Sequence, residues 1–183
     1  DPIEWSTIGR GLEFSRIGVY RNSKDGSREL VDRIAAVRIN PEYNAIKVIN
    51  GYVPKTDQCE TKTIEEWQTK TGATVLVNGA QYMAEPWGRP CGLVIEDGKY
   101  EGPLENKAVK GMLIAEPRSE DLPKADVLDF HYDNFNPNTT RYTEGMQHWP
   151  IILNRDGQIK VNNSDWQANR TVFAKDKDGN IIF

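Results

Sequence analysis

Short apolar runs separated by polar turns follow one another along most of the chain, a pattern typical of β-strands. The β-branched run at residues 73–77 predicts a buried strand, and a second strand is expected over residues 92–95. Asn78-Gly79 and Asp97-Gly98 follow these strands, and both pairs favour sharp turns. A polar, aromatic loop therefore lies between two strands, either as a binding site or as a plain connection.

Period-two alternation predicts further strands on both sides of this stretch. Leu12, Phe14, Ile17 and Val19 predict one or two edge strands within residues 1–21. Residues 22–27 form a turn. A strand is favoured over a helix for residues 30–40 because the run ends at Asn-Pro. Other strands are expected at residues 45–53, 111–115, 126–132, 149–153, 171–174 and 181–183.

One segment has the start and stop signals of a helix. Thr63 can cap the free N–H groups of the first turn, and Glu66 can reach back to the backbone of Thr63. Gly72 can end the helix in the left-handed conformation. Ile64 and Trp67 are three residues apart and are expected to share a buried face.

The order strand, helix, strand around this segment predicts a parallel crossover. The sequence therefore indicates an α+β fold: a mixed, mostly antiparallel sheet of many short strands with one or two helices.

Length and charge limit the classes of function. A chain of 183 residues fits a single domain over 1–183. The net charge is −4 and no basic stripe is present, so nucleic acid is not an expected partner. Apolar runs are far shorter than the ~20 residues of a membrane span, so the protein is not expected to cross a membrane. Cys59 and Cys91 allow either one disulfide or two thiols.

Four motifs in order give the chain a family resemblance. They are Val-Asn-Gly-Ala-Gln-Tyr at 77–82, the Pro-x-Gly-Leu-x-Ile-x-x-Gly match at 90–98, the Gln-x-x-Pro-x-x-Leu segment at 147–153 with Gly157, and the Arg-Thr-x-x-Ala-x-Asp-x-Asp-Gly segment at 170–179. With these motifs, residues 35–183 resemble the phosphodiester glycosidase family, whose founding member is the lysosomal uncovering enzyme. The chain departs from the family at Ala80, which replaces a glycine, and in having only Tyr82 of an aromatic pair. The family's acidic-glycine motif would fall after Phe183, so the domain is expected to be incomplete at its C-terminus.

The resemblance implies an exported, bacterial-type hydrolase that cleaves a sugar-1-phosphodiester or a phosphorylated glycan, including exopolysaccharide. The implied location is extracytoplasmic, in secreted, periplasmic or surface-anchored form, and the implied ligand is a carbohydrate or sugar phosphate. The alternative is a non-catalytic glycan-binding or envelope-associated module on the same scaffold. A third interpretation is a purely structural or interaction domain.

The candidate catalytic residues are Asn78, Arg170 and His148. The guanidinium of Arg170 offers a planar fork for phosphate, although a surface arginine is the plainer interpretation. Asn78 can bind a sugar hydroxyl or orient a carboxylate, and it can equally serve as a turn residue. His148 can act as a general acid or base, or as a structural histidine.

Four further residues are predicted to bind substrate. Gln147 adjoins His148 in the third motif, and Glu85 supplies a carboxylate in the central loop. Tyr82 and Trp87 can stack on a sugar ring, or they can fill core. No metal-binding motif is present, and the sequence leaves the need for a divalent cation open.

Overall fold

The computed structural model describes residues 3–103, 109–162 and 170–183. The chain divides into two compact units. Unit 1 comprises Asp1–Ala45 and Val172–Phe183, and unit 2 comprises Ile46–Thr171. Each unit is described by itself below. The expectation of a single domain over residues 1–183 stays a prediction.

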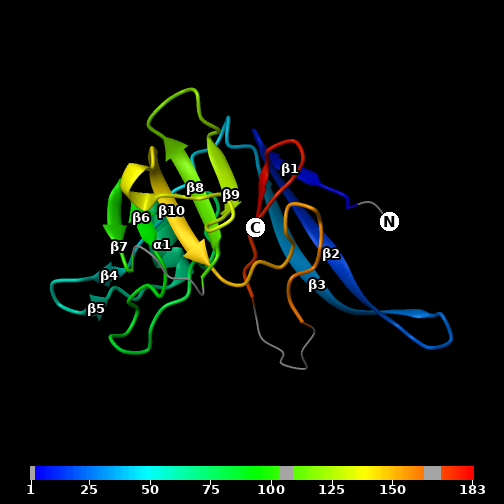
Figure 1. The fold of residues 1–183 in the computed structure, drawn as a ribbon. Coiled ribbons are helices and arrows are strands. Elements are labelled where there is room, and N and C mark those ends of the chain that lie inside the picture. Colours follow the sequence, from blue (N-terminus) through cyan, green and yellow to red (C-terminus); the bar gives the residue numbers. More distant parts are fainter. Residues whose placement is uncertain (1–2, 104–108, 163–169) are drawn as a thin grey trace. The chain divides into compact units, whose positions relative to one another are not determined.

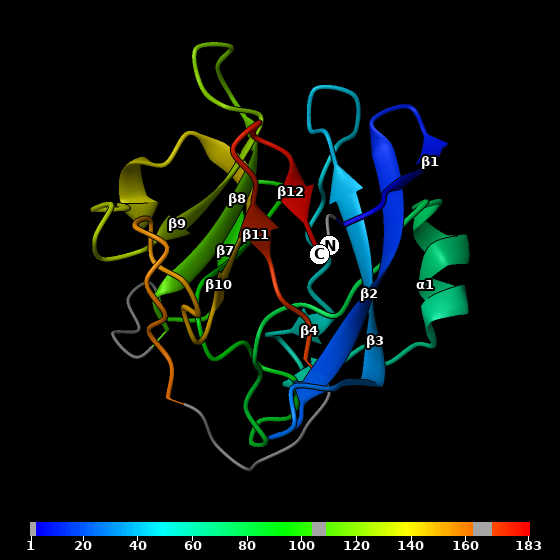
Figure 2. The ribbon, with the colours of Figure 1, turned by 90° about the vertical axis from the view of Figure 1, so that its right-hand side faces the viewer.

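Unit 1 is a five-stranded antiparallel sheet in the order β1-β2-β3-β12-β11. The strands are β1 (Ser6–Gly9), β2 (Leu12–Asn22), β3 (Arg28–Ile39), β11 (Ala174–Lys175) and β12 (Ile181–Ile182). The pairing of β2 with β3 produces the long ribbon seen in Figure 2. Its buried side chains lie near one end of the ribbon, at Leu12, Ser15, Ala36 and Ile39. The other end is exposed, and the turn there is closed by the carboxylate of Asp25.

Unit 2 contains a second antiparallel five-stranded sheet, in the order β7-β6-β10-β8-β9 (Figure 1). Its strands are β6 (Val94–Glu96), β7 (Lys99–Glu101), β8 (Gly111–Pro117), β9 (Ala125–Asp129) and β10 (Tyr142–His148). A small hairpin of β4 (Tyr52–Val53) and β5 (Gln58–Cys59) precedes the helix α1 (Ile64–Thr71). A short 3-10 helix, η1, covers Pro137–Thr139.

Both faces of this sheet carry buried side chains, since the four consecutive residues 112–115 of β8 are all buried. Ile95 of β6 and Ile114 of β8 lie opposite Gly145 of β10 in the strand register. A side chain at Gly145 would lie 2.8 Å from the terminal methyl of Met112, so glycine leaves room for close packing. The buried cluster comprises Leu93, Ile95, Met112, Ile114, Phe130 and Tyr142.

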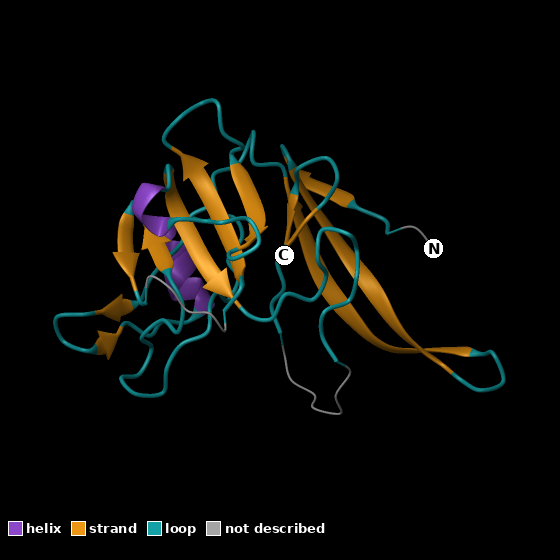
Figure 3. Ribbon diagram, in the orientation of Figure 1, coloured by secondary structure: helices purple, strands orange, loops and turns teal. Residues whose placement is uncertain are grey.

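The prediction of an α+β fold is wrong. Within the described residues, α1 is the single α-helix, and the two main sheets are wholly antiparallel (Figure 3). The structure is therefore nearly all-β. The predicted parallel crossover is absent from the described residues, because residues 73–77 pair with no strand there. A β-branched run becomes a strand only when another backbone supplies its hydrogen bonds, and Val77 is instead exposed.

The helix has the predicted ends but lacks the predicted buried face. Thr63 and Glu66 form a reciprocal capping box, and Gly72 ends the helix at φ 69°. No residue of α1 is buried, and Ile64 is 56% exposed. The ammonium groups of Lys62 and Lys70 lie over the ring of Trp67, at 5.9 and 4.8 Å. Lysine side chains therefore cover this ring, which is only partly buried.

The remaining predictions for strands and hairpins are confirmed only in part. The hairpins at residues 22–27 and 97–98 form as expected. The strand expected at residues 149–153 does not form, because β10 covers the residues before them and ends at His148, where pairing with β8 stops. Of residues 45–53 only β4 is a strand, and Ile46 and Tyr52 are buried.

Candidate functional site

Strand β10 organises unit 2 because it lies between β6 and β8 and presents different side chains to its two faces. Side chains two apart on a strand point the same way. Glu144, Met146 and His148 therefore share one face, and Gly145 and Gln147 share the other. The sequence motif around residue 147 thus places neighbouring residues in different environments.

The turn predicted at Asn78-Gly79 is held against β10 by Met146 and His148. The sulfur of Met146 lies 2.8 Å from the backbone nitrogen of Ala80. A side chain at Gly79 would lie 2.6 Å from the same sulfur, so the turn approaches β10 this closely only with glycine. The Nε2 atom of His148 lies 3.2 Å from the carbonyl oxygen of Gly79.

The surroundings of His148 favour a neutral ring. Burial is the main cause that lowers its pKa below the usual 6.5, against the opposing effect of backbone hydrogen bonds to Gly79 and Trp149. A carbonyl oxygen can only accept a hydrogen bond, so the geometry assigns the proton of the neutral ring to Nε2. Nδ1 then faces the side-chain nitrogen of Gln81, at 3.5 Å.

Gln81 is a member of this group that the sequence did not single out. Its side-chain nitrogen donates a 2.6 Å hydrogen bond to the carbonyl oxygen of Trp149, the residue after β10. Its side-chain oxygen is buried without a hydrogen-bond partner. The only feature of the sequence that could have pointed to Gln81 was its position, two residues after the predicted turn. Its partners lie 67 and 68 residues away and could not be inferred locally.

The loop after the turn presents an aromatic pair to solvent. The rings of Tyr82 and Trp87 meet edge to face, with centroids 4.7 Å apart. Tyr82 is 55% exposed and Trp87 is 51% exposed, so both rings keep open surface. The loop is closed by a hydrogen bond from the N–H of Met83 to the carbonyl of Arg89. Glu85 lies exposed on the same loop.

Gln147 lies away from this group, on the core side of β10. It is fully buried. Its side-chain oxygen accepts from the N–H of Leu93 at 2.7 Å, and its side-chain nitrogen donates to the carbonyl of Val109 at 3.0 Å. In this structure Gln147 joins backbone segments across the core, and its predicted contact with substrate has no geometric support.

The other predicted residues have simpler positions. Asn78 and Arg170 are both exposed, so each can reach a ligand in solvent. The structure thus brings together the turn of Asn78, His148 and the aromatic loop. The assignment of Arg170 to phosphate stays a prediction. Cys59 and Cys91 form no disulfide in the described structure.

The family profile for phosphodiester glycosidases matches residues 71–183, which is more than half of the chain. The chain belongs to the phosphodiester glycosidase family. Searches of curated proteins and of solved structures found no match. The part matched to the phosphodiester glycosidases includes the turn, the aromatic loop, β10 and Arg170. Family membership supports a glycosidase-like function and a carbohydrate ligand for this site.

Two other properties concern the described residues of this phosphodiester glycosidase family member. Among the described residues, no three His, Cys, Asp or Glu side chains lie together in an arrangement that could hold a metal ion. Neither α1 nor η1 has the length and apolar character of a membrane-spanning helix.

Proposed function

We propose that this protein is an exported hydrolase that cleaves a sugar-1-phosphodiester or a phosphorylated glycan at the bond between sugar and phosphate. The family match over residues 71–183 carries this proposal, because it contains the whole turn and loop beside His148. The open aromatic rings add support, since the apolar face of a sugar can stack on them.

The residues have separable roles in this reaction. Tyr82 and Trp87 hold the sugar ring, and Asn78 binds one of its hydroxyls. Arg170 binds the phosphate and stabilises its charge as it leaves. Water adds its oxygen to the anomeric carbon, the bond from this carbon to the phosphate oxygen breaks, and a phosphomonoester departs. The carboxylate of Glu85 assists the oxocarbenium-like transition state or accepts the proton of the attacking water.

The test is release of free sugar from a panel of hexose-1-phosphate methyl diesters by the full-length protein. Arg170→Ala should lower kcat/KM by roughly 100-fold, because a charged hydrogen bond to the leaving group is lost. Its thermal stability should stay that of the parent, since Arg170 is exposed. Arg21→Ala, an exposed arginine of unit 1, is the matched control.

Two outcomes would contradict parts of this proposal. An Arg170→Ala rate equal to that of Arg21→Ala would remove Arg170 from the site. Absence of turnover by the parent protein on every diester would contradict the hydrolase itself. The proposed location has a separate test in cell fractionation, where recovery from the cytosol alone would contradict export.

A second candidate function is glycan binding without catalysis. The observation that favours it is the engagement of both His148 ring nitrogens with protein atoms, Gly79 O and Gln81 Nε2. A ring held in this way is a poor proton shuttle unless the turn moves. Calorimetric binding of an uncleaved diester, with no sugar released, would support this candidate over the hydrolase.

A further inference from the structure

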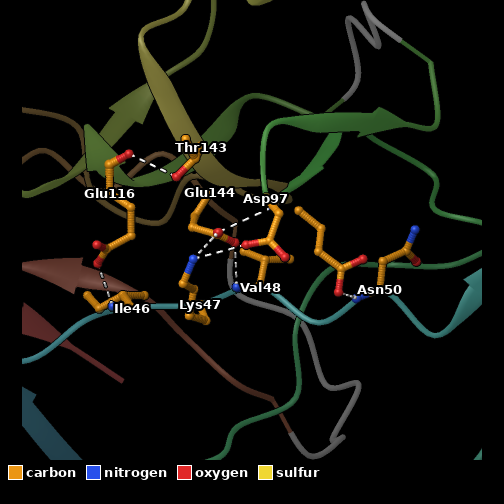
Figure 4. A network of polar contacts seen from close by, with 9 residues as sticks. Ile46, Lys47, Val48, Asn50, Asp97, Glu116, Thr143 and Glu144 are labelled. Carbon is orange, nitrogen blue, oxygen red and sulfur yellow. Dashed lines mark hydrogen bonds and ion pairs between the residues drawn. The ribbon is translucent and has the colours of Figure 1, made fainter. Parts of the chain in front are cut away.

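Residues 46–50 form an extended segment, here called the strap, whose backbone N–H groups bind side-chain carboxylates (Figure 4). Alternate N–H groups along the strap point to the same side, as in a strand. Each is accepted by one glutamate: Ile46 by Glu116 at 2.9 Å, Val48 by Glu144 at 3.0 Å, and Asn50 by Glu96 at 3.2 Å.

The three carboxylates come from three adjacent strands. Glu116 lies on β8, Glu144 on β10 and Glu96 on β6, and β10 is the strand between the other two. The strap therefore crosses the sheet from strand to strand, with one glutamate per strand. Side-chain carboxylates here replace the backbone carbonyls that would receive these N–H groups in a ladder.

Glu144 is the centre of this arrangement because it is fully buried and binds three donors. One oxygen accepts from the ammonium of Lys47 at 2.8 Å and from the N–H of Asp97 at 3.3 Å, and the other accepts from Val48. Lys47 also binds the carboxylate of Asp97 at 3.0 Å.

The pKa values of its partners agree with this arrangement. The hydrogen bond to Glu144 is the main cause that raises the pKa of Lys47, followed by the hydrogen bond to Asp97. The pKa of Asp97 is lowered mainly by its hydrogen bond to Lys47. The ammonium group of Lys47 therefore forms ion pairs with two carboxylates, those of Asp97 and Glu144.

We propose that the strap is a proton-operated latch, in which proton binding by the Glu144 carboxylate releases residues 46–50 while β6, β8 and β10 stay paired. A protonated carboxyl group presents a donor at one oxygen, so it can no longer accept from all three partners. The charged groups around the strap are the carboxylates of Glu96, Glu116 and Asp97 and the ammonium of Lys47. The ammonium of Lys99 acts on Asp97.

The sheet does not depend on the strap for its own pairing. Met146 pairs with Val94 on one side of β10 and with Leu113 on the other. The strap also lies outside the family match, whereas its three glutamates lie within it. The proposed release thus concerns a segment that precedes the matched region.

Release has a consequence for the connection between the units. The strap begins directly after Ala45, where unit 1 passes into unit 2. The chain passes between the units a second time at Thr171–Val172. Freeing the five residues of the strap lengthens the first of these two connections by up to about 17 Å, at roughly 3.3 Å for each extended residue. The latch thus couples proton concentration to the reach of the connecting chain.

The test is amide hydrogen exchange measured by NMR on the whole chain between pH 7 and pH 4, with rates corrected for their intrinsic pH dependence. The amides of Ile46, Val48 and Asn50 should lose at least tenfold of their protection together as the pH falls. The amide of Met146 should keep its protection. Glu144→Gln should show the same loss already at pH 7, whereas Glu120→Gln, an exposed control with the same charge change, should not.

Three results would overturn the latch. They are unchanged protection of the strap amides down to pH 4, loss at three separate pH values, and simultaneous loss at Met146, which would indicate unfolding of the sheet. Should Glu144→Gln fail to fold, Glu116→Gln is the second variant, because it removes only the contact to Ile46 at one end of the strap. It should expose the amide of Ile46 at pH 7 and leave that of Val48 protected.

Discussion

The two ends of one face of β10 hold their neighbouring segments in different ways. At one end Glu144 is fully buried and binds the strap and Asp97 through three hydrogen bonds of 2.8, 3.0 and 3.3 Å, the first of them from a lysine. At the other end His148 is half-buried, and its ring nitrogens lie 3.2 Å from the carbonyl oxygen of Gly79 and 3.5 Å from the side-chain nitrogen of Gln81.

Strand β10 therefore holds the strap firmly at its Glu144 end and leaves the turn easier to rearrange at its His148 end. Charged hydrogen bonds in a buried place hold the strap strongly in the charged state of Glu144. Weak contacts to a sulfur and an imidazole hold the turn loosely, beside exposed aromatic rings. Binding loops are drawn from the less stable parts of proteins, and the His148 end has this character. The candidate site therefore lies at the end where rearrangement costs less.

The largest expected effect is at the Glu144 end. Glu144→Ala should lower the free energy of unfolding by about 3 kcal/mol, because the N–H groups of Val48 and Asp97 lose their acceptor. The exposed half of Lys47 limits this loss, since water can take over its charge. Urea unfolding measures the change, with Glu120→Ala as a control that should stay within about 0.5 kcal/mol of the parent. An equal loss of unfolding free energy in Glu144→Ala and Glu120→Ala would show that the contacts of Glu144 do not stabilise its end of β10.

An intermediate effect is expected where the turn meets Met146. Gly79→Ala should cost about 1–2 kcal/mol, because the new methyl group would lie 2.6 Å from the sulfur. In a Met146→Ala background the same change should cost less than about 0.5 kcal/mol, since the sulfur is gone. A double-mutant cycle in urea gives this coupling directly. Additive costs would show that the turn is not held by Met146.

The sequence-based predictions are confirmed for features that depend only on neighbouring residues. The caps of α1 and the hairpin at Asp97-Gly98 depend on residues within a few positions, and both form as expected. Each of these features needs no partner from elsewhere in the chain.

The failures came where a partner lies far along the chain. Residues 73–77 have the composition of a strand but gain no backbone partner among the described residues. The strap has its N–H groups bound by carboxylates 46 to 96 residues away, an arrangement that no local pattern predicts. The burial of Gln147 likewise depends on the register of β10 and not on its motif, whereas its contact with substrate stays a prediction. Long-range pairing overrides local preference in all three cases.

The smallest expected effect is a pH dependence at the His148 end. Burial lowers the pKa of His148 in the folded protein below 6.5, so the unfolded chain binds more protons as the pH falls through this value. Its contribution to stability is therefore complete above pH 6.5 and declines on acidification, until the folded ring also becomes charged. NMR titration should place the ring of His148 below 6.5, its signal being assigned by its loss in His148→Gln. The unfolding free energy of that variant should change less between pH 7.5 and 5.5 than that of the parent. A titration above 6.5 would mean that an anionic group stabilises the charged ring, and the two ends of β10 would then hold their segments by the same kind of interaction.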